Sequence, residues 1–245
     1  MSRITLRRIS LINTPLNVPP IRDITDQLPR HPSYTWDTFP TRRDSKGNAI
    51  AGKRKFEDIK AVAVHHTGVI GGSPVSHANY KIRQGLPGNP YHIQIVKGQP
   101  LQTNDLLSFT YGVGNHNDYT IHVAVEGDFT QQPLLEVDRN ALYAVLLTLD
   151  RIFPNIKILG HNEFSGAKTS CPGFDMNRVR RDVEALKETL EYQESPNSDR
   201  ARAYSIAERI LDLYNKAQDE NFKYRDEAIR KLLATEKFFK EQGWI

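Results

Sequence analysis

Two histidines and one cysteine are the residues of this 245-residue chain whose types are best suited to chemistry. His65 lies near the end of the apolar segment IKAVAVHH, and His161 follows the segment NIKILG. Cys171, the only cysteine, comes ten residues later in GHNEFSGAKTSCPGF. Two imidazoles and one thiolate suit Zn²⁺, and three protein ligands leave a fourth position for water, whose pKa zinc lowers to about 7. These residue types predict one catalytic zinc ion and a hydrolytic reaction.

Other interpretations fit the same residues. A histidine at a strand end is often a hydrogen-bonded surface residue, and a single cysteine is often an inert buried side chain. Cys171 with a histidine would also suit a cysteine hydrolase, in which the thiolate attacks the substrate. The His-x9-Cys spacing matches no short zinc motif, so the residues alone leave these alternatives open.

A frame of strands and helices must bring these residues together. Short apolar or alternating runs predict strands over 59–66, 91–103, 120–129 and 155–161, the second of which turns at Gly98. Helical spacing and end signals, among them Ser73 as an N-cap, predict helices over 73–85, 135–154 and 174–193. Strands that alternate with helices predict the α/β class, with a mixed central β-sheet flanked by helices.

The two ends of the chain differ from this central region. Six prolines precede residue 41, so residues 1–58 are predicted to form an extended N-terminal arm packed on the core. Residues 59–194 are predicted to form the zinc-binding domain. The segment ESPNS then breaks the helical pattern, and residues 195–245 are predicted to form a C-terminal helical extension. These helices would cap the domain or join two copies, so a monomer or a dimer is expected.

Charge and hydropathy restrict the partners. The net charge of +4 and the pI near 9.1 favour binding to polyanions. The same values also fit an ordinary soluble surface with no such partner. The basic clusters lack the interleaved aromatic residues of a single-strand platform, so no nucleic-acid partner is expected. No apolar run approaches about 18 residues, so no membrane span is expected. The N-terminus lacks the features of a Sec signal peptide, which predicts synthesis in the cytoplasm without Sec export.

Several motifs in series resemble the type 2 N-acetylmuramoyl-L-alanine amidases, which share their fold with peptidoglycan recognition proteins and many phage endolysins. The motifs VHHT, PYHIQI and GHNEFSGAKTSCPGF occur in the order of that family, over about half of the chain. The resemblance implies a peptidoglycan-recognition-protein-like fold, with 59–194 as a zinc amidase domain. It also implies hydrolysis of the amide between N-acetylmuramic acid and L-alanine in peptidoglycan, by an endolysin-like enzyme that acts on the cell wall after release in phage or prophage lysis.

The resemblance implies roles for individual residues. His65, His161 and Cys171 match the three zinc ligands of the family. Tyr91 in PYHI matches the tyrosine that assists the reaction beside the zinc ion. The donor that stabilises the oxyanion matches either Thr169 or its neighbour Lys168, and both are kept as candidates.

The chain departs from the family pattern along the strand TIHVAV. Ala124 stands where some members have a glutamate, and Glu126 lies two residues later on the same face. Glu126, His66 and His116 are predicted to contact the substrate, although His116 would also fit an exposed loop. His122 stands where the family usually has glycine, and it is interpreted as a neighbour of the site rather than a ligand.

The competing function is a non-catalytic peptidoglycan-binding module of the same fold. Recognition-only relatives typically carry serine at the position of Cys171, and they lose zinc. The presence of Cys171 and Tyr91 therefore favours an active enzyme. In this context the helices at 195–245 would also fit a small wall-binding element.

Overall fold

The computed structural model describes residues 5–40, 42–43, 46–49, 52–193, 230 and 237. Residues 1–184 form one compact unit, and residues 185–245 form a second. The first unit contains the whole sheet and every predicted site residue. The predicted helical extension at 195–245 lies outside the described residues, apart from Arg230 and Lys237, and it stays a prediction.

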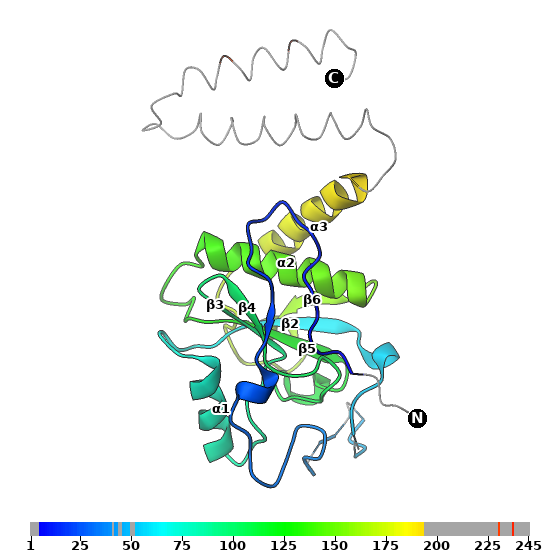
Figure 1. The fold of residues 1–245 in the computed structure, drawn as a ribbon, viewed down its shortest axis with the longest axis vertical. Coiled ribbons are helices and arrows are strands. Elements are labelled where there is room, and N and C mark those ends of the chain that lie inside the picture. The colour runs from blue at the N-terminus through cyan, green and yellow to red at the C-terminus, as the bar shows by residue number, and fades with distance from the viewer. Residues whose placement is uncertain are drawn as a thin grey trace. The chain divides into compact units, whose positions relative to one another are not determined.

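A six-stranded sheet forms the centre of the first unit, in the order β1-β4-β3-β5-β2-β6 (Figure 1). The strands are β1 (Arg22–Asp23), β2 (Ala61–His66), β3 (Ile93–Val96), β4 (Gln99–Gln102), β5 (Thr120–Val125) and β6 (Lys157–Gly160). Only β3 and β4 pair antiparallel, so the predicted mixed sheet and the hairpin at Gly98 are confirmed. The strand predicted over 120–129 ends earlier, because the backbone leaves the extended conformation at Gly127, where φ is +139°.

The two central strands explain why the sheet places its chemistry at one edge. Every residue of β5 and all but the last residue of β2 are buried, as in parallel strands covered on both faces. Their register pairs Ala63 with His122 and His65 with Ala124. Since β2, β5 and β6 are parallel, their carboxyl ends meet at the same edge of the sheet.

Three helices cover the sheet: α1 (Pro74–Arg83), α2 (Glu136–Ile152) and α3 (Met176–Gln193). The hydroxyl of Ser73 accepts a hydrogen bond from the backbone of Ser76 at 3.1 Å, which confirms the predicted N-cap of α1. α2 packs on β3 and β4, and the hydroxyl of Tyr143 donates to Asp182 of α3 at 2.7 Å. In Figure 1, α2 lies on one side of the sheet and α1 on the other.

The N-terminal arm adds to the sheet and crosses the core. Its strand β1 pairs in parallel with β4, at the edge of the sheet. The carbonyl of Leu6 accepts hydrogen bonds from the backbone of Leu106 and the side chain of Gln102, and the backbone of Ile12 donates to Thr148 of α2. The predicted extended arm is therefore part of the folded unit.

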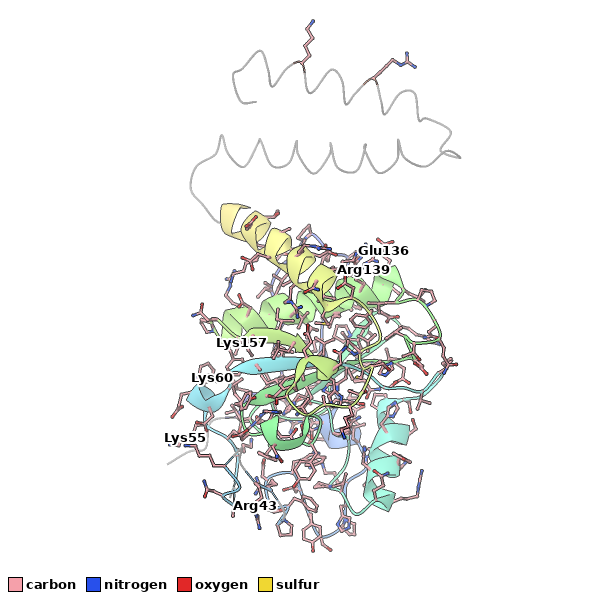
Figure 2. All side chains as sticks on the ribbon, turned by 180° about the vertical axis from the view of Figure 1, so that it is seen from behind. Arg43, Lys55, Lys60, Glu136, Arg139 and Lys157 are labelled. Atoms are coloured by element: carbon pink, nitrogen blue, oxygen red, sulfur yellow. The ribbon has the colours of Figure 1, made fainter. Side chains whose placement is uncertain are left out.

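Basic side chains lie at the amino-terminal ends of strands β2 and β6 (Figure 2). Lys60 precedes β2 and Lys157 begins β6, and both side chains are exposed. These positions are at the strand ends opposite His65 and His161, so this positive charge is not concentrated at the predicted site. Within the described ranges, no helix combines the length and the apolar character that a membrane span needs.

Candidate active site

His65, His161 and Cys171 come together at the carboxyl edge of the sheet. Their ligand atoms all lie within 4.8 Å of one another. The sulfur of Cys171 is 3.7 Å from Nδ1 of His65, and the two imidazole centroids are 4.8 Å apart. Tetrahedral zinc, with bonds of about 2.1 Å to nitrogen and 2.3 Å to sulfur, holds such ligand atoms roughly 3.6 Å apart. The donor types and spacing fit one zinc ion.

Each of the three side chains is delivered by a different segment. His65 is the fifth residue of β2, and His161 begins a short turn (His161–Glu163) directly after β6. Glu163 stabilises this turn, because its carboxylate accepts the backbone N–H of Gly160 at 2.7 Å and pairs with Arg180 of α3 at 2.7 Å.

The loop that carries Cys171 is held by backbone hydrogen bonds on both sides. The carbonyl of Cys171 accepts a hydrogen bond from the backbone N–H of Asn162 at 2.8 Å. The N–H of Cys171 donates to the hydroxyl of Thr169 at 3.1 Å. The sulfur also receives the backbone N–H of His66 at 3.4 Å. These contacts fix the thiol against the end of β2.

Burial sets the protonation of the cluster. It lowers the pKa of His65 well below its usual value, and the neighbouring histidines His122, His161 and His66 add to the effect. Burial also lowers the pKa of His161, so both imidazoles are neutral at pH 7 and have a lone pair for a metal. Burial raises the pKa of Cys171 to about 11, against the opposing effect of the His66 N–H. A thiol with this pKa is a poor nucleophile, which argues against the cysteine-hydrolase alternative.

A cavity of about 280 Å³ opens onto the cluster. Besides the three residues of the cluster, its lining contains two predicted site residues, Tyr91 and His66. The remaining lining residues are Thr67, Gly68, Lys81, Pro90, Tyr111 and Gly112. A substrate can therefore reach the cluster through this cavity, whose wall includes the loop after β2 and the loop before β3.

Tyr91 faces the cluster from the segment before β3. Its ring centroid is 5.6 Å from that of His65. The side chain of Asn89 accepts its backbone N–H at 3.0 Å, and Thr103 donates to its carbonyl at 2.8 Å. Burial raises the pKa of Tyr91, with smaller contributions from Cys171 and Glu126, so the hydroxyl remains a hydrogen-bond donor at neutral pH.

The two candidates for the oxyanion donor lie in the loop before Cys171. Lys168 and Thr169 are both exposed, and neither is among the residues that line the cavity. The hydroxyl of Thr169 is tied to the backbone N–H of Cys171. The loop therefore holds Thr169 beside the cluster through a direct contact, whereas Lys168 has no such tie to Cys171.

His66 lines the cavity, whereas Glu126 does not. Nδ1 of His66 accepts the backbone N–H of Phe129 at 3.2 Å, which orients the ring at the cavity wall. The carboxylate of Glu126 accepts from Gln94 at 2.6 Å and lies 2.9 Å from Nε2 of His77. Glu126 is not itself a lining residue, so its predicted contact with substrate stays a prediction.

His116 lies away from the cavity lining. Its Nδ1 is 2.8 Å from the hydroxyl of Tyr119, and its Nε2 is 3.0 Å from the carbonyl of Ser165. The ring also packs on Phe164. These contacts attach the loop after β6 to the segment before β5, and a substrate contact of His116 stays a prediction.

Lys81 and Tyr111 are two of the six lining residues that were not anticipated from the sequence. Lys81 reaches the cavity from α1, and burial lowers the pKa of its amine. Lys81 follows His77 by four residues on a predicted helix, so the two side chains lie on the same helix face. This shared face was the sequence signal that could have indicated Lys81 as a site residue. Tyr111 comes from an irregular segment and packs on Trp36 and Phe39 of the arm, a contact for which the sequence carries no periodic signal.

A buried polar network lies behind the cluster. Nε2 of His65 is 3.2 Å from Nδ1 of His122, and the backbone N–H of His122 donates to Nδ1 of His92 at 2.9 Å. The buried guanidinium of Arg54 is also part of this polar region. It donates to the carbonyls of Leu106, Asn117 and Thr120 at 2.7, 2.8 and 2.5 Å. Burial lowers the pKa of Arg54 to about 9, so it is charged at pH 7.

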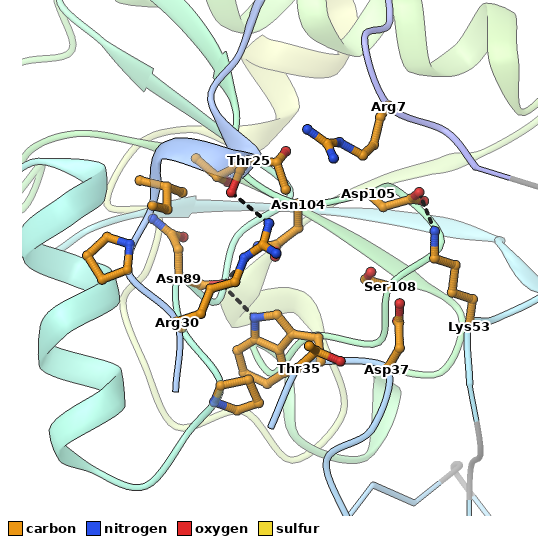
Figure 3. A pocket seen from close by; sticks show the side chains of 16 residues that line it. Arg7, Thr25, Arg30, Thr35, Asp37, Lys53, Asn89, Asn104, Asp105 and Ser108 are labelled. Atoms are coloured by element: carbon orange, nitrogen blue, oxygen red, sulfur yellow. Dashed lines mark hydrogen bonds and ion pairs between the residues drawn. The ribbon is translucent and has the colours of Figure 1, made fainter. Parts of the chain in front are cut away.

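A second cavity, of about 190 Å³, lies between the arm and the core (Figure 3). Lys53 pairs with Asp105 at 2.6 Å across its wall, and Arg30 donates to the carbonyl of Thr25 at 2.9 Å. None of the cluster residues lines this cavity. Its Lys53–Asp105 pair joins the arm to the segment after β4.

The mixed α/β sheet carries a His–His–Cys cluster, a candidate metal site, at the carboxyl ends of its parallel strands. Residues 55–174, just under half of the chain, match the family described as N-acetylmuramoyl-L-alanine amidase. These residues form a type 2 amidase domain, and the protein is a peptidoglycan amidase.

The chain is also similar to solved structures. The endolysin amidase LysCS from Clostridium intestinale URNW is 18% identical, with a TM-score of 0.52, over 69% of this chain and 98% of that chain. The amidase LysC from the same organism is 19% identical, with a TM-score of 0.53, over 68% and 98%. Drosophila peptidoglycan recognition protein SD is 18% identical, with a TM-score of 0.48, over 74% and 96%. No protein with a curated description matched the sequence.

Proposed function

We propose that this amidase holds one zinc ion between His65, His161 and Cys171, and hydrolyses the amide that joins N-acetylmuramic acid to L-alanine. The observation that carries the proposal is the convergence of two neutral imidazoles and a thiol within 4.8 Å, at a cavity of about 280 Å³. When bound in such a site, zinc supplies an activated water and polarises the scissile carbonyl.

The side chains around the cluster supply orientation and hydrogen bonds. Tyr91 is held in place by its backbone contacts, and its protonated hydroxyl donates to the oxygen of the scissile carbonyl as negative charge develops there. Thr169 is the better of the two remaining donors, because its hydroxyl is tied to Cys171 and keeps one proton to donate. Lys168 would then serve as an exposed cation near the entrance.

The cavity wall offers groups for the rest of the substrate. The stem peptides of peptidoglycan carry carboxylates, and Lys81 of α1 lines the cavity. His66 also lines it, and its ring is oriented by the backbone N–H of Phe129. We infer that these two residues bind the stem peptide and that Glu126 acts through its contact with His77.

The family match and the fold support a proposal for the biological setting. LysCS is described as an endolysin, and it shares this fold over nearly its whole length. We infer that the present enzyme also degrades the cell wall from within after release, as in phage or prophage lysis. The proposal predicts lysis of intact peptidoglycan sacculi by the purified protein.

The test combines zinc content with product analysis. Wild-type protein is expected to carry one zinc ion per chain and to release new L-alanine amino termini from purified sacculi. Cys171→Ser is expected to lose both, whereas Ser170→Ala, an exposed neighbour, is expected to keep both. Normal zinc content without new L-alanine termini would overturn the catalytic proposal. Activity that survives complete chelation, or normal zinc and turnover in Cys171→Ser, would overturn the ligand assignment.

A further inference from the structure

His122 is a buried histidine that the proposed reaction does not use. It lies in the middle of β5 with no exposed surface, and its backbone pairs with Ala63 of β2. Its ring reaches across to β2, where Nδ1 of His122 is 3.2 Å from Nε2 of His65. A buried imidazole in hydrogen-bond contact with a candidate ligand requires an explanation, because a buried polar ring without a role carries a cost.

The contacts of His65 determine which of its nitrogens carries the proton. Nδ1 lies 3.7 Å from the sulfur of Cys171, on the side of the cluster, and Nε2 lies against His122. A metal at the cluster needs the lone pair of Nδ1, so the proton must be on Nε2. That N–H then donates to Nδ1 of His122, so the proton of His122 is on Nε2, which is buried without a hydrogen-bond partner among the described residues.

His122 is held in the orientation that this hydrogen bond needs. Its backbone N–H donates to Nδ1 of His92 and its carbonyl accepts the backbone N–H of His92, both at 2.9 Å. The two rings stack with centroids 5.4 Å apart. Because a backbone N–H can only donate, Nδ1 of His92 is the acceptor and the proton of His92 is on Nε2, which lies 2.9 Å from the carbonyl of Ser108 and 3.1 Å from the guanidinium of Arg54.

Gly112 closes the remaining side of the ring. A methyl group at this position would lie 2.6 Å from Nδ1 and 2.7 Å from Cε1 of His122. The backbone of Gly112 is itself fixed, because its N–H donates to the side chain of Asn117 at 2.9 Å. The imidazole of His122 is therefore confined between Gly112, His92 and His65.

We propose that His122 is a positioning residue, whose Nδ1 accepts a hydrogen bond from His65 and thereby fixes the lone pair of His65 Nδ1 toward the zinc ion. This inference rests on the proposed zinc site. Groups that orient metal-bound histidines typically change metal affinity by about 10- to 100-fold when they are removed. His122 acts only through His65 and has no contact with the substrate cavity.

The test separates the hydrogen bond from packing. In His122→Leu the bulk remains but the acceptor is lost, and zinc affinity measured by competition with a chromophoric chelator is expected to fall about 10- to 100-fold. In His122→Asn the side-chain oxygen replaces the acceptor, and affinity is expected to recover to within about threefold of wild type, as judged from the acceptor chemistry of the amide. Val123→Ala is the matched control, because it removes bulk from the opposite face of β5.

Two further measurements keep the test independent of activity. Urea unfolding of each zinc-free protein shows whether a loss of affinity reflects a damaged fold. In zinc-loaded wild-type protein, ¹⁵N-edited spectra are expected to show a slowly exchanging proton on Nε2 of His65, which the His122→Leu variant loses.

The outcomes distinguish this inference from the proposed function. Wild-type zinc affinity in His122→Leu, or an equal loss in His122→Leu and His122→Asn, would overturn the positioning role while the zinc site stands. Wild-type protein that binds no zinc would overturn the proposed site, and the positioning role with it.

Discussion

Replacing Arg54 with methionine tests the idea that one buried guanidinium organises the floor of the active site. Arg54 is almost completely buried, with 5% of its surface exposed. It donates to the backbone carbonyls of Leu106, Asn117 and Thr120 at 2.5–2.8 Å, and a longer bond of 3.5 Å goes to the carbonyl of Leu107. Methionine has a similar length and no donor, so the variant leaves these carbonyls buried without a partner.

The expected loss can be worked out from these contacts. Each orphaned buried acceptor costs about 1–3 kcal/mol, so three of them cost roughly 3–9 kcal/mol. Removal of a buried cation returns part of this energy, because the cation no longer has to be desolvated. We therefore expect the free energy of unfolding to fall by about 3–5 kcal/mol, a large part of the 5–15 kcal/mol that is typical of a domain.

The assay is urea unfolding followed by circular dichroism, with reversibility checked at each concentration. Lys60→Met is the matched control, because it introduces the same residue at an exposed lysine six positions away (Figure 2). The control is expected to stay within about 0.5 kcal/mol of wild type. A loss below about 1 kcal/mol in Arg54→Met, against the 1–3 kcal/mol for even one orphaned acceptor, would refute the proposed role of this residue.

Three other predictions concern helix α2, the cysteine loop and the reaction. Burial raises the pKa of Asp138, against the hydrogen bond from Gly98, so the folded state binds this proton more tightly than the unfolded state. The contribution of Asp138 to stability should therefore fall as pH rises above about 4, and Asp138→Asn should raise the thermal midpoint relative to wild type at pH 7 but not at pH 3. Gly173→Ala should lose more stability in urea than Gly166→Ala; their φ angles are +82° and +81°, but only at Gly173 would a methyl group meet backbone, at 2.8 Å. Tyr91→Phe should keep its zinc and lose about 100-fold in kcat on sacculi, and an unchanged kcat would exclude the donor role.

Local patterns in the sequence were sufficient for much of the fold. The run AVAVHH predicts a buried strand, because its residues are apolar on both faces, and the hairpin at Gly98 follows from alternation on both sides of a turn. Ser73 identifies the start of α1 by the chemistry of its hydroxyl. The convergence of His65 with His161 and Cys171 was predicted from strand ends and from the family resemblance, and the structure brings the three together.

The network behind the site could not be predicted in this way. Arg54 stands in the basic segment GKRK and has the sequence pattern of a solvated cluster, although it is buried while its neighbour Lys55 is exposed. The contact between His65 and His122 depends on the parallel register of β2 and β5, which brings together residues 57 positions apart. Register of this kind is set by the packing of the whole sheet, so no local pattern indicates it.

The pairing of β1 with β4 has a consequence for how the protein can be divided. The family match begins at residue 55, whereas β1 (Arg22–Asp23) covers the outer edge of β4 (Gln99–Gln102). A fragment cut at the family boundary would present the N–H and C=O groups of β4 to solvent, and such edges recruit strands from other chains. The segment that precedes the catalytic residues therefore covers an edge of the catalytic sheet, and we expect a fragment that lacks this segment to self-associate.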